Sequence, residues 1–239
     1  MRTESEILAH DEPHDPGMAG RLNWLRAGVL GANDGIVSTA GLVIGVAGAT
    51  SQTPLIVTAG IAGLAAGAMS MAVGEFISVS TQRDSERALL AKERRELRET
   101  PDEELAELAG LYAAKGLTPD VAQMVAEQLT AVDALAAHAE VELGIDPDAL
   151  TNPRHAAWAS FVAFVVGALP PLLAMAFLPV GTRVALTVAA VVLALALTGV
   201  VSARLGHARW ERPVLRNVMG GLLAMTLTYG IGTLVGRAV

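Results

Sequence analysis

The stretch LRAGVLGANDGIVSTAGLVIGVAGA, residues 25–49, decides the fold. It is long enough to cross a bilayer as one helix, which takes about 20 residues. Most of it is glycine, alanine and branched aliphatic residues, and Asn33 and Asp34 form a polar step within this apolar run. A carboxylate inside a membrane helix is energetically expensive and marks a functional position by default. The stretch therefore predicts a membrane-spanning helix in which Asp34 has a functional role.

Four further segments are similarly apolar, at residues 55–79, 156–178, 184–203 and 214–235. Of the 239 residues, 52% are hydrophobic and only 17% are charged. A spanning backbone must satisfy its own hydrogen bonds, so these five segments predict an all-α membrane protein. The chain has no cysteine, which excludes disulfides, zinc–thiolate sites and a thiol nucleophile. It also carries none of the common catalytic motifs, so we do not expect an enzyme.

Basic residues near the helix ends predict the orientation. Arginines precede the first span, follow the second and lie between the fourth and fifth, whereas the opposite connections hold no basic residue before Arg183. This alternation predicts a cytoplasmic N-terminus and an external C-terminus. We expect a disordered tail at residues 1–21, two spans within 22–80, a cytoplasmic insert at 81–150 and three spans within 151–239.

The insert holds 16 of the 24 acidic residues and 7 of the 17 basic ones, a net charge of −9. It is predicted to form three helices, the first continuing the second span. The second helix is expected after Thr100 as N-cap, with Pro101 in its first turn, a capping box closed by Glu103 and a stop at Gly116. The third is expected to run from the motif TPDVAQ to Gly144. Apolar stripes are predicted to pack these helices together or against a second copy: Leu89, Leu90, Leu97; Leu105, Leu108, Leu111; Val121, Met124, Val125, Leu129, Val132, Leu135.

Pairs of acids on these helices could hold a metal ion, because residues three or four apart share a helix face. Carboxylate with imidazole suits Fe²⁺, Mn²⁺, Co²⁺ or Zn²⁺. Acids interleaved with arginines are also typical of a solvated, salt-bridged face, so both interpretations stand at this point. The candidate ligands are Glu93 and Glu96 on the first helix, Glu104 and Glu107 on the second, and His138 and Glu142 on the third.

In the second span, Met71 and Glu75 add a thioether and a carboxylate to Asp34 as candidate ligands within the membrane. A soft and a hard ligand together tolerate Fe²⁺ while discriminating against Mg²⁺ and Ca²⁺. Methionine also fills cores, and Glu75 could instead reach the cytoplasmic interface, so these alternatives stay open.

Three motifs carry a resemblance: LGANDGIVSTAGLVIGVAGA at 30–49, AGAMSMAVGEFISVSTQRD at 66–84 and TYGIGTLVG at 228–236. In this order, with five spans and an insert after the second, residues 22–236 resemble the vacuolar iron transporter family, including its bacterial and nodulin-like members. The resemblance implies a homodimeric transporter of Fe²⁺, and often Mn²⁺, that exchanges metal for protons. It also implies export from the cytoplasm along the dimer interface, here across a bacterial cell membrane.

The resemblance also assigns residues. The family's aspartate in the first helix falls on Asp34, and its pathway methionine in the second falls on Met71. A glutamate that some members carry in the first half of the second helix is replaced by Gly63, which leaves the proton coupling open. His138 and Ala139 stand where the family's insert has a pair of methionines, which implies a nitrogen ligand at His138 in place of a sulfur ligand. The family's insert glutamates fall on Glu93, Glu96, Glu104, Glu107 and Glu142.

Two other functions remain possible from the sequence. A membrane-anchored protein could sense or buffer metal without transporting it, or a structural membrane dimer could use the insert for protein docking. We expect no permanently bound cofactor and no nucleic-acid partner. The expected partners are divalent ions, protons, the bilayer and a second copy.

Overall fold

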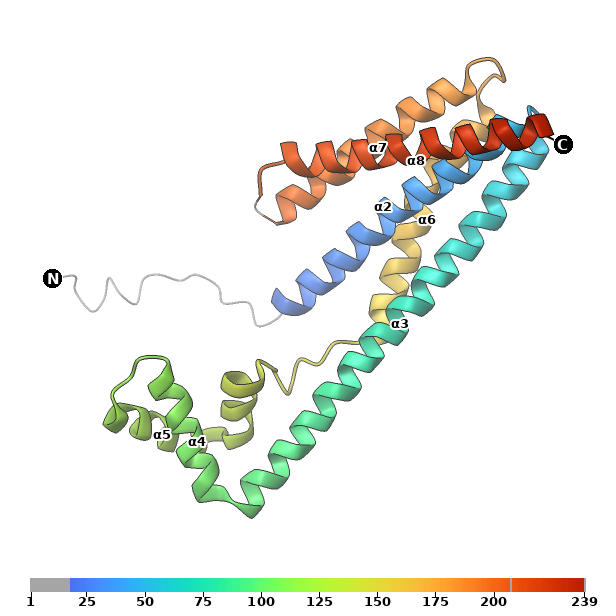
Figure 1. Ribbon diagram of the computed structural model, residues 1–239. Coiled ribbons are helices and arrows are strands. Elements are labelled where there is room, and N and C mark those ends of the chain that lie inside the picture. Colours follow the sequence, from blue (N-terminus) through green and yellow to red (C-terminus); the bar gives the residue numbers. More distant parts are fainter. Residues whose placement is uncertain (1–17, 207, 239) are drawn as a thin grey trace.

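The computed structural model describes residues 18–206 and 208–238, and every regular element in these ranges is helical (Figure 1). Five of the helices are long and apolar enough to cross a membrane: α2, α3, α6, α7 and α8. The predicted all-helical fold with five spans is therefore confirmed for the described part of the chain. The elements are α2 (Met18–Ala49), α3 (Thr53–Glu99), α4 (Pro101–Ala114), α5 (Pro119–His138), the π-helix η1 (Ala139–Leu143), α6 (Pro153–Phe177), α7 (Arg183–Leu205) and α8 (Glu211–Ala238).

The predicted tail at residues 1–21 lies largely outside the described residues. Its last four residues, from Met18, belong to the first turn of α2. The domain boundaries proposed from the sequence otherwise stay predictions.

Helix α2 lies at the centre of the bundle and packs against α6, α8, α3 and α7 (Figure 1). Its buried side chains Val43 and Ile44 belong to one core cluster with residues from each of the other four spans. The core contributed by those spans comprises Ile56 of α3, Leu172 and Met175 of α6, Val191 and Leu195 of α7, and Met225 of α8.

Small residues let the backbones of these helices approach closely. A methyl group at Gly35 would overlap the carbonyl oxygen of Phe164 on α6, and one at Gly232 of α8 would overlap that of Gly45. The glycines of α2 thus face α6 at one end and α8 at the other. The sequence did not specify these partners.

Arg183 is almost wholly buried at the start of α7. Its Nη1 donates to Thr53 Oγ1 at 2.8 Å and its Nη2 donates to the Ser51 carbonyl at 2.8 Å. A buried guanidinium needs such partners, because an unpaired charge in an apolar environment is costly. Arg183 therefore ties the start of α7 to the turn between α2 and α3, a role that its place near a helix end did not reveal.

Helix α3 extends far beyond the bundle (Figure 1). Its 47 residues span about 70 Å at 1.5 Å per residue, whereas a bilayer core is only about 30 Å thick. Roughly its second half therefore projects from the spans and carries α4, α5 and η1 at its far end. The end of α8 lies at the opposite end of the molecule from these helices (Figure 1).

Helix α4 starts one residue after α3 ends, and this short connection removes the predicted capping box. Thr100 is at once the C-cap of α3 and the N-cap of α4, with φ −135° and ψ 55°. In this conformation its Oγ1 donates to the Glu96 carbonyl at 3.3 Å and does not cap α4. Gly116 ends α4 in the left-handed region, as predicted, with φ 102°.

Only part of the apolar stripe predicted for the third insert helix is buried within the single chain, where Leu129 packs against the cluster around Leu108. The buried face of α5 includes Ala122 and Ala126, and Ala126 packs with Leu108 of α4. Val132 is 87% exposed. Val121 and Met124 are exposed as well. Small residues let α5 lie close to α4, so the larger side chains point outward.

Candidate metal centre

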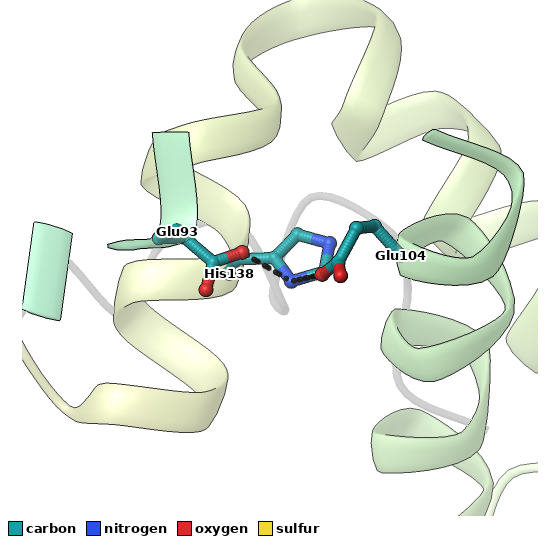
Figure 2. A group of neighbouring side chains, drawn as sticks. All are labelled: Glu93, Glu104 and His138. Atoms are coloured by element: carbon teal, nitrogen blue, oxygen red, sulfur yellow. Dashed lines mark ion pairs between the residues drawn. The ribbon is translucent and has the colours of Figure 1, made fainter. Parts of the chain in front are cut away.

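Three insert helices bring Glu93, Glu104 and His138 together (Figure 2). Each offers one ligand atom, and these three atoms lie within 4.8 Å of one another. The His138 Nδ1 atom lies 3.0 Å from Glu93 Oε1 and 3.7 Å from Glu104 Oε2. Two carboxylates and one imidazole around a common point form a ligand set for a divalent transition metal.

Apolar packing positions the three side chains. Glu93 lies one turn after the buried Leu90 on α3, and Glu104 lies one turn before the buried Leu108 on α4. Leu108 packs against Ala126 and Ala137 of α5. Glu93 and Glu104 therefore continue the buried faces of their own helices.

The three ligands are buried, at 2% exposure for Glu93, 7% for Glu104 and none for His138. Although Glu93 Oε1 and His138 Nδ1 lie close, neither makes a hydrogen bond of acceptable geometry, and Nε2 of His138 has none either. Buried polar atoms are normally paired, because an unpaired one costs about 1–3 kcal/mol. Buried ligand atoms that gather around one point and lack hydrogen-bond partners favour a cation site over a solvated, salt-bridged helix face.

The pKa values of Glu93 and Glu104 are shifted by their burial and by the neighbouring charges. Burial raises the pKa of Glu93 above its ordinary value; the neighbouring carboxylates act in the same direction, and the imidazole of His138 opposes them. Burial also raises the pKa of Glu104, and the charge of Glu107 adds to this. A bound cation would reverse this balance by favouring the ionised carboxylates.

The other three predicted insert ligands lie at or beyond the edge of this group. Glu142 Oε2 is 3.8 Å from His138 Nδ1 and lies at the rim. Glu96 Oε2 instead accepts from Lys92 Nζ at 2.7 Å. Glu107 is exposed one turn beyond Glu104. A spacing of three or four residues made the two members of each pair look equivalent, but only one member of each pair turns inward.

A second candidate site lies among the spans. Asp34 of α2 and Met71 of α3 line one pocket of about 220 Å³. Phe164 of α6 closes part of it, and Gly63 also lies on its wall. Glu75 is half-buried four residues beyond Met71 and does not line the pocket. The structure therefore brings together two of the three predicted pathway residues.

Sequence reasoning missed three hydroxyl groups in this pocket, those of Ser38, Thr39 and Ser70. Thr39 Oγ1 is buried without a hydrogen-bond partner, whereas Ser38 Oγ donates to the Asp34 carbonyl at 2.6 Å. The spacing could have revealed Ser38, because it follows Asp34 by four residues and shares its side of the helix.

Residues 25–233 match the sequence profile of the VIT family. The chain belongs to the VIT family. It is 45% identical over 217 residues to a vacuolar iron transporter of Acanthamoeba castellanii, which covers 90% of this chain and 80% of that protein. It is 40% identical over 215 residues to vacuolar iron transporter homolog 5 of Oryza sativa subsp. japonica, covering 90% of this chain and 81% of the relative. It is 39% identical over 217 residues to vacuolar iron transporter homolog 3 of Arabidopsis thaliana, covering 90% and 85%.

Membership of the VIT family confirms the resemblance found in the motifs and the expectation that the chain is a transporter and not an enzyme. An integral membrane protein is supported by the family and by the five apolar helices. These relatives come from an amoeba and from plants. The bacterial cell membrane and the orientation across it stay predictions.

Proposed function

We propose that this VIT-family chain exports Fe²⁺ and Mn²⁺ from the cytoplasm in exchange for protons, and that its acidic insert captures the ion. The observation that carries the proposal is the pocket shared by Asp34 and Met71, which come from different spans. The relatives named vacuolar iron transporter support iron as the cargo.

Capture takes place at Glu93, Glu104 and His138, with Glu142 and the more exposed Glu96 and Glu107 as entry ligands. The insert's net charge of −9 raises the local cation concentration around this centre. The imidazole favours transition metals over Mg²⁺ and Ca²⁺, which prefer oxygen ligands alone. Zn²⁺ and Co²⁺ also suit this donor set and are expected to compete for it.

The ion then enters the pocket of Asp34 and Met71, with Glu75 on the side toward the insert. The hydroxyl groups of Ser38 and Ser70 supply neutral oxygen ligands that can replace part of the hydration shell. One carboxylate leaves a divalent ion with a net positive charge, which is unfavourable in a membrane.

A second copy would resolve this charge imbalance by bringing another Asp34. Large apolar side chains are exposed on α3, including Ile61, Met69 and Val73, and on the insert at Val132. They offer faces for a homodimer on both the span and the insert.

Proton exchange follows from the competition of a proton and a metal for the same carboxylate. Protonation of Asp34 from the outside lowers its affinity for metal and releases the ion. Gly63, which lines the same pocket, contributes no carboxylate, so Asp34 carries this exchange alone within each copy.

Asp34→Asn tests the proposal, because the amide keeps the size of the side chain and removes its charge. Fe²⁺ uptake into proteoliposomes is expected to fall to background, while Asp84→Asn, an exposed acid outside both sites, keeps wild-type flux. Wild-type flux in Asp34→Asn would refute the role of this carboxylate. Flux that is insensitive to a pH gradient in the wild type would refute the exchange.

Two alternatives make different predictions in the same experiment. A metal-sensing or metal-buffering protein binds ions at the insert but gives no flux in the wild type. A structural dimer with a docking insert gives neither flux nor metal-dependent stability.

A further inference from the structure

Helix α5 is interrupted at Asp133. This residue has φ −159° and ψ 97°, which is extended backbone inside an otherwise helical segment. A break of this kind needs a local cause, and here it is neither a proline nor a glycine.

The pattern of buried residues explains why the break falls at this position. Ala122 and Ala126 are buried and Leu129 packs against the same cluster. Continued at helical spacing, this face reaches residue 133 next. An unbroken helix would therefore point the carboxylate of Asp133 into the apolar cluster, which is costly for an unpaired charge. The break leaves Asp133 exposed instead.

At the break, Asp133 begins a new helical segment. Its Oδ1 accepts a hydrogen bond from the backbone N–H of Ala136 at 2.9 Å. Extended backbone with a side-chain oxygen bound to the third N–H is the geometry of an N-cap. The segment ends at Gly144 in the left-handed region, where the Ile145 N–H donates to the Ala139 carbonyl at 2.9 Å. We call residues 134–143 the ligand arm.

The ligand arm carries two of the candidate insert ligands, His138 and Glu142. Ala137, His138 and Ala139 are all buried, a run that fits the change from α-helix to π-helix and not a regular helical face. The direction of the arm therefore decides whether the imidazole reaches Glu93 and Glu104. That direction is set where the arm begins.

We propose that Asp133 is a positioning residue for the insert metal centre: by capping the ligand arm it orients His138 and Glu142 toward Glu93 and Glu104 without touching the ion. This inference rests on the proposed insert site. The cap is formed by an acceptor oxygen and not by a negative charge, so asparagine and serine should replace aspartate here, whereas alanine should not.

The test uses the full-length chain in detergent, in an Asp34→Asn background so that the insert is read alone. Mn²⁺ is titrated by electron paramagnetic resonance, with ¹⁴N modulation of the signal reporting on the imidazole. Asp133→Ala is expected to weaken Mn²⁺ binding about fivefold, as for the loss of one N-cap bond, and to reduce the nitrogen modulation. Asp133→Asn and Asp133→Ser should stay within about twofold of the parent.

Glu127→Ala is the matched control, because it removes one exposed acid from α5 without removing a cap. The proposal is overturned if Asp133→Ala binds Mn²⁺ like Glu127→Ala. It is overturned too if Asp133→Asn is as weak as Asp133→Ala, which would assign the effect to charge. The double variant Glu93→Gln with Glu104→Gln distinguishes failure of the insert metal centre from failure of the positioning role of Asp133. If that double variant binds like its parent, the insert centre itself is wrong; if it loses binding while Asp133→Ala does not, only the positioning role fails.

Discussion

Replacing Glu93 by glutamine should stabilise the empty insert and destroy its response to metal. The side chain is 2% exposed, and its Oε1 lacks a hydrogen bond. Burial raises its pKa, so the folded insert binds a proton more readily than the unfolded chain does. For such a group the stabilisation is present at low pH and is lost as pH rises through the folded pKa. At neutral pH the ionised carboxylate therefore works against folding.

The expected change in stability is worked out for the metal-free insert and for the Mn²⁺-bound insert. An unsatisfied buried polar group costs about 1–3 kcal/mol, and a glutamine amide still needs partners, so we expect a gain of about 1 kcal/mol for the empty insert at pH 7.5. Mn²⁺ at 100 times its dissociation constant stabilises the wild type by about 2.7 kcal/mol. The variant loses a direct ligand, which should weaken binding by at least about 100-fold, since even outer-shell partners are worth 10- to 100-fold. The order of stability should thus reverse when Mn²⁺ is added.

Hydrogen–deuterium exchange of the full-length chain in detergent measures this, read from peptides within residues 101–143. Without metal, Glu93→Gln should exchange more slowly than wild type at pH 7.5, and the difference should shrink as the pH is lowered and Glu93 of the wild type takes up a proton. With Mn²⁺, the wild type should become the slower of the two. Faster exchange of the metal-free variant at pH 7.5, or equal protection of both proteins by Mn²⁺, would refute the reasoning.

Three further predictions follow from the packing and the ligand geometry. Glu104→Ala should weaken Mn²⁺ binding to the insert at least tenfold in a titration of the full-length chain, whereas the exposed Glu107→Ala should change it less than about threefold; equal effects would contradict the assignment. Gly35→Leu should lower the thermal midpoint in detergent, because overpacking costs about 1–3 kcal/mol, while Gly74→Leu, which has open space around it, should leave the midpoint unchanged. Arg183→Lys should also lower the midpoint by removing one of two buried hydrogen bonds, worth about 1.5–3 kcal/mol for a charged donor; an unchanged midpoint would show that the hydrogen bonds of Arg183 to Thr53 and Ser51 are not needed for stability.

Hydrophobicity alone predicted the spans, because the need to satisfy backbone hydrogen bonds in lipid leaves few alternatives. The functional residues were harder to predict. Asp34 stood out as an ionisable residue in an apolar run, and the structure places it beside Met71. The serine and threonine hydroxyls in the same pocket were missed, because such residues are common in membrane helices and carry no charge to draw attention.

In the insert, spacing identified the acids but not their directions. A separation of three residues places Glu93 and Glu96 on one face, yet only Glu93 turns toward the centre, while Glu96 pairs with Lys92. The break at Asp133 was also missed, because aspartate is tolerated within helices and the burial that forbids it here arises only when α5 packs on α4. The direction of each glutamate and the break at Asp133 both depend on tertiary packing, which helical periodicity does not reveal.

Helix α3 joins the two candidate sites as one continuous rod. Met71 and Glu93 are 22 residues apart on it, about 33 Å at the helical rise, so an ion cannot pass directly from one site to the other and must diffuse between them. Because α3 is one long helix, a small tilt near Met71 becomes a larger displacement at its far end. A tilt of about 5° around the level of Met71 would move Glu93 by about 3 Å at this length. Because α4 and α5 are attached to the far end of α3, they would move with Glu93, so a change in the packing of α3 among the spans would shift the insert centre as a whole.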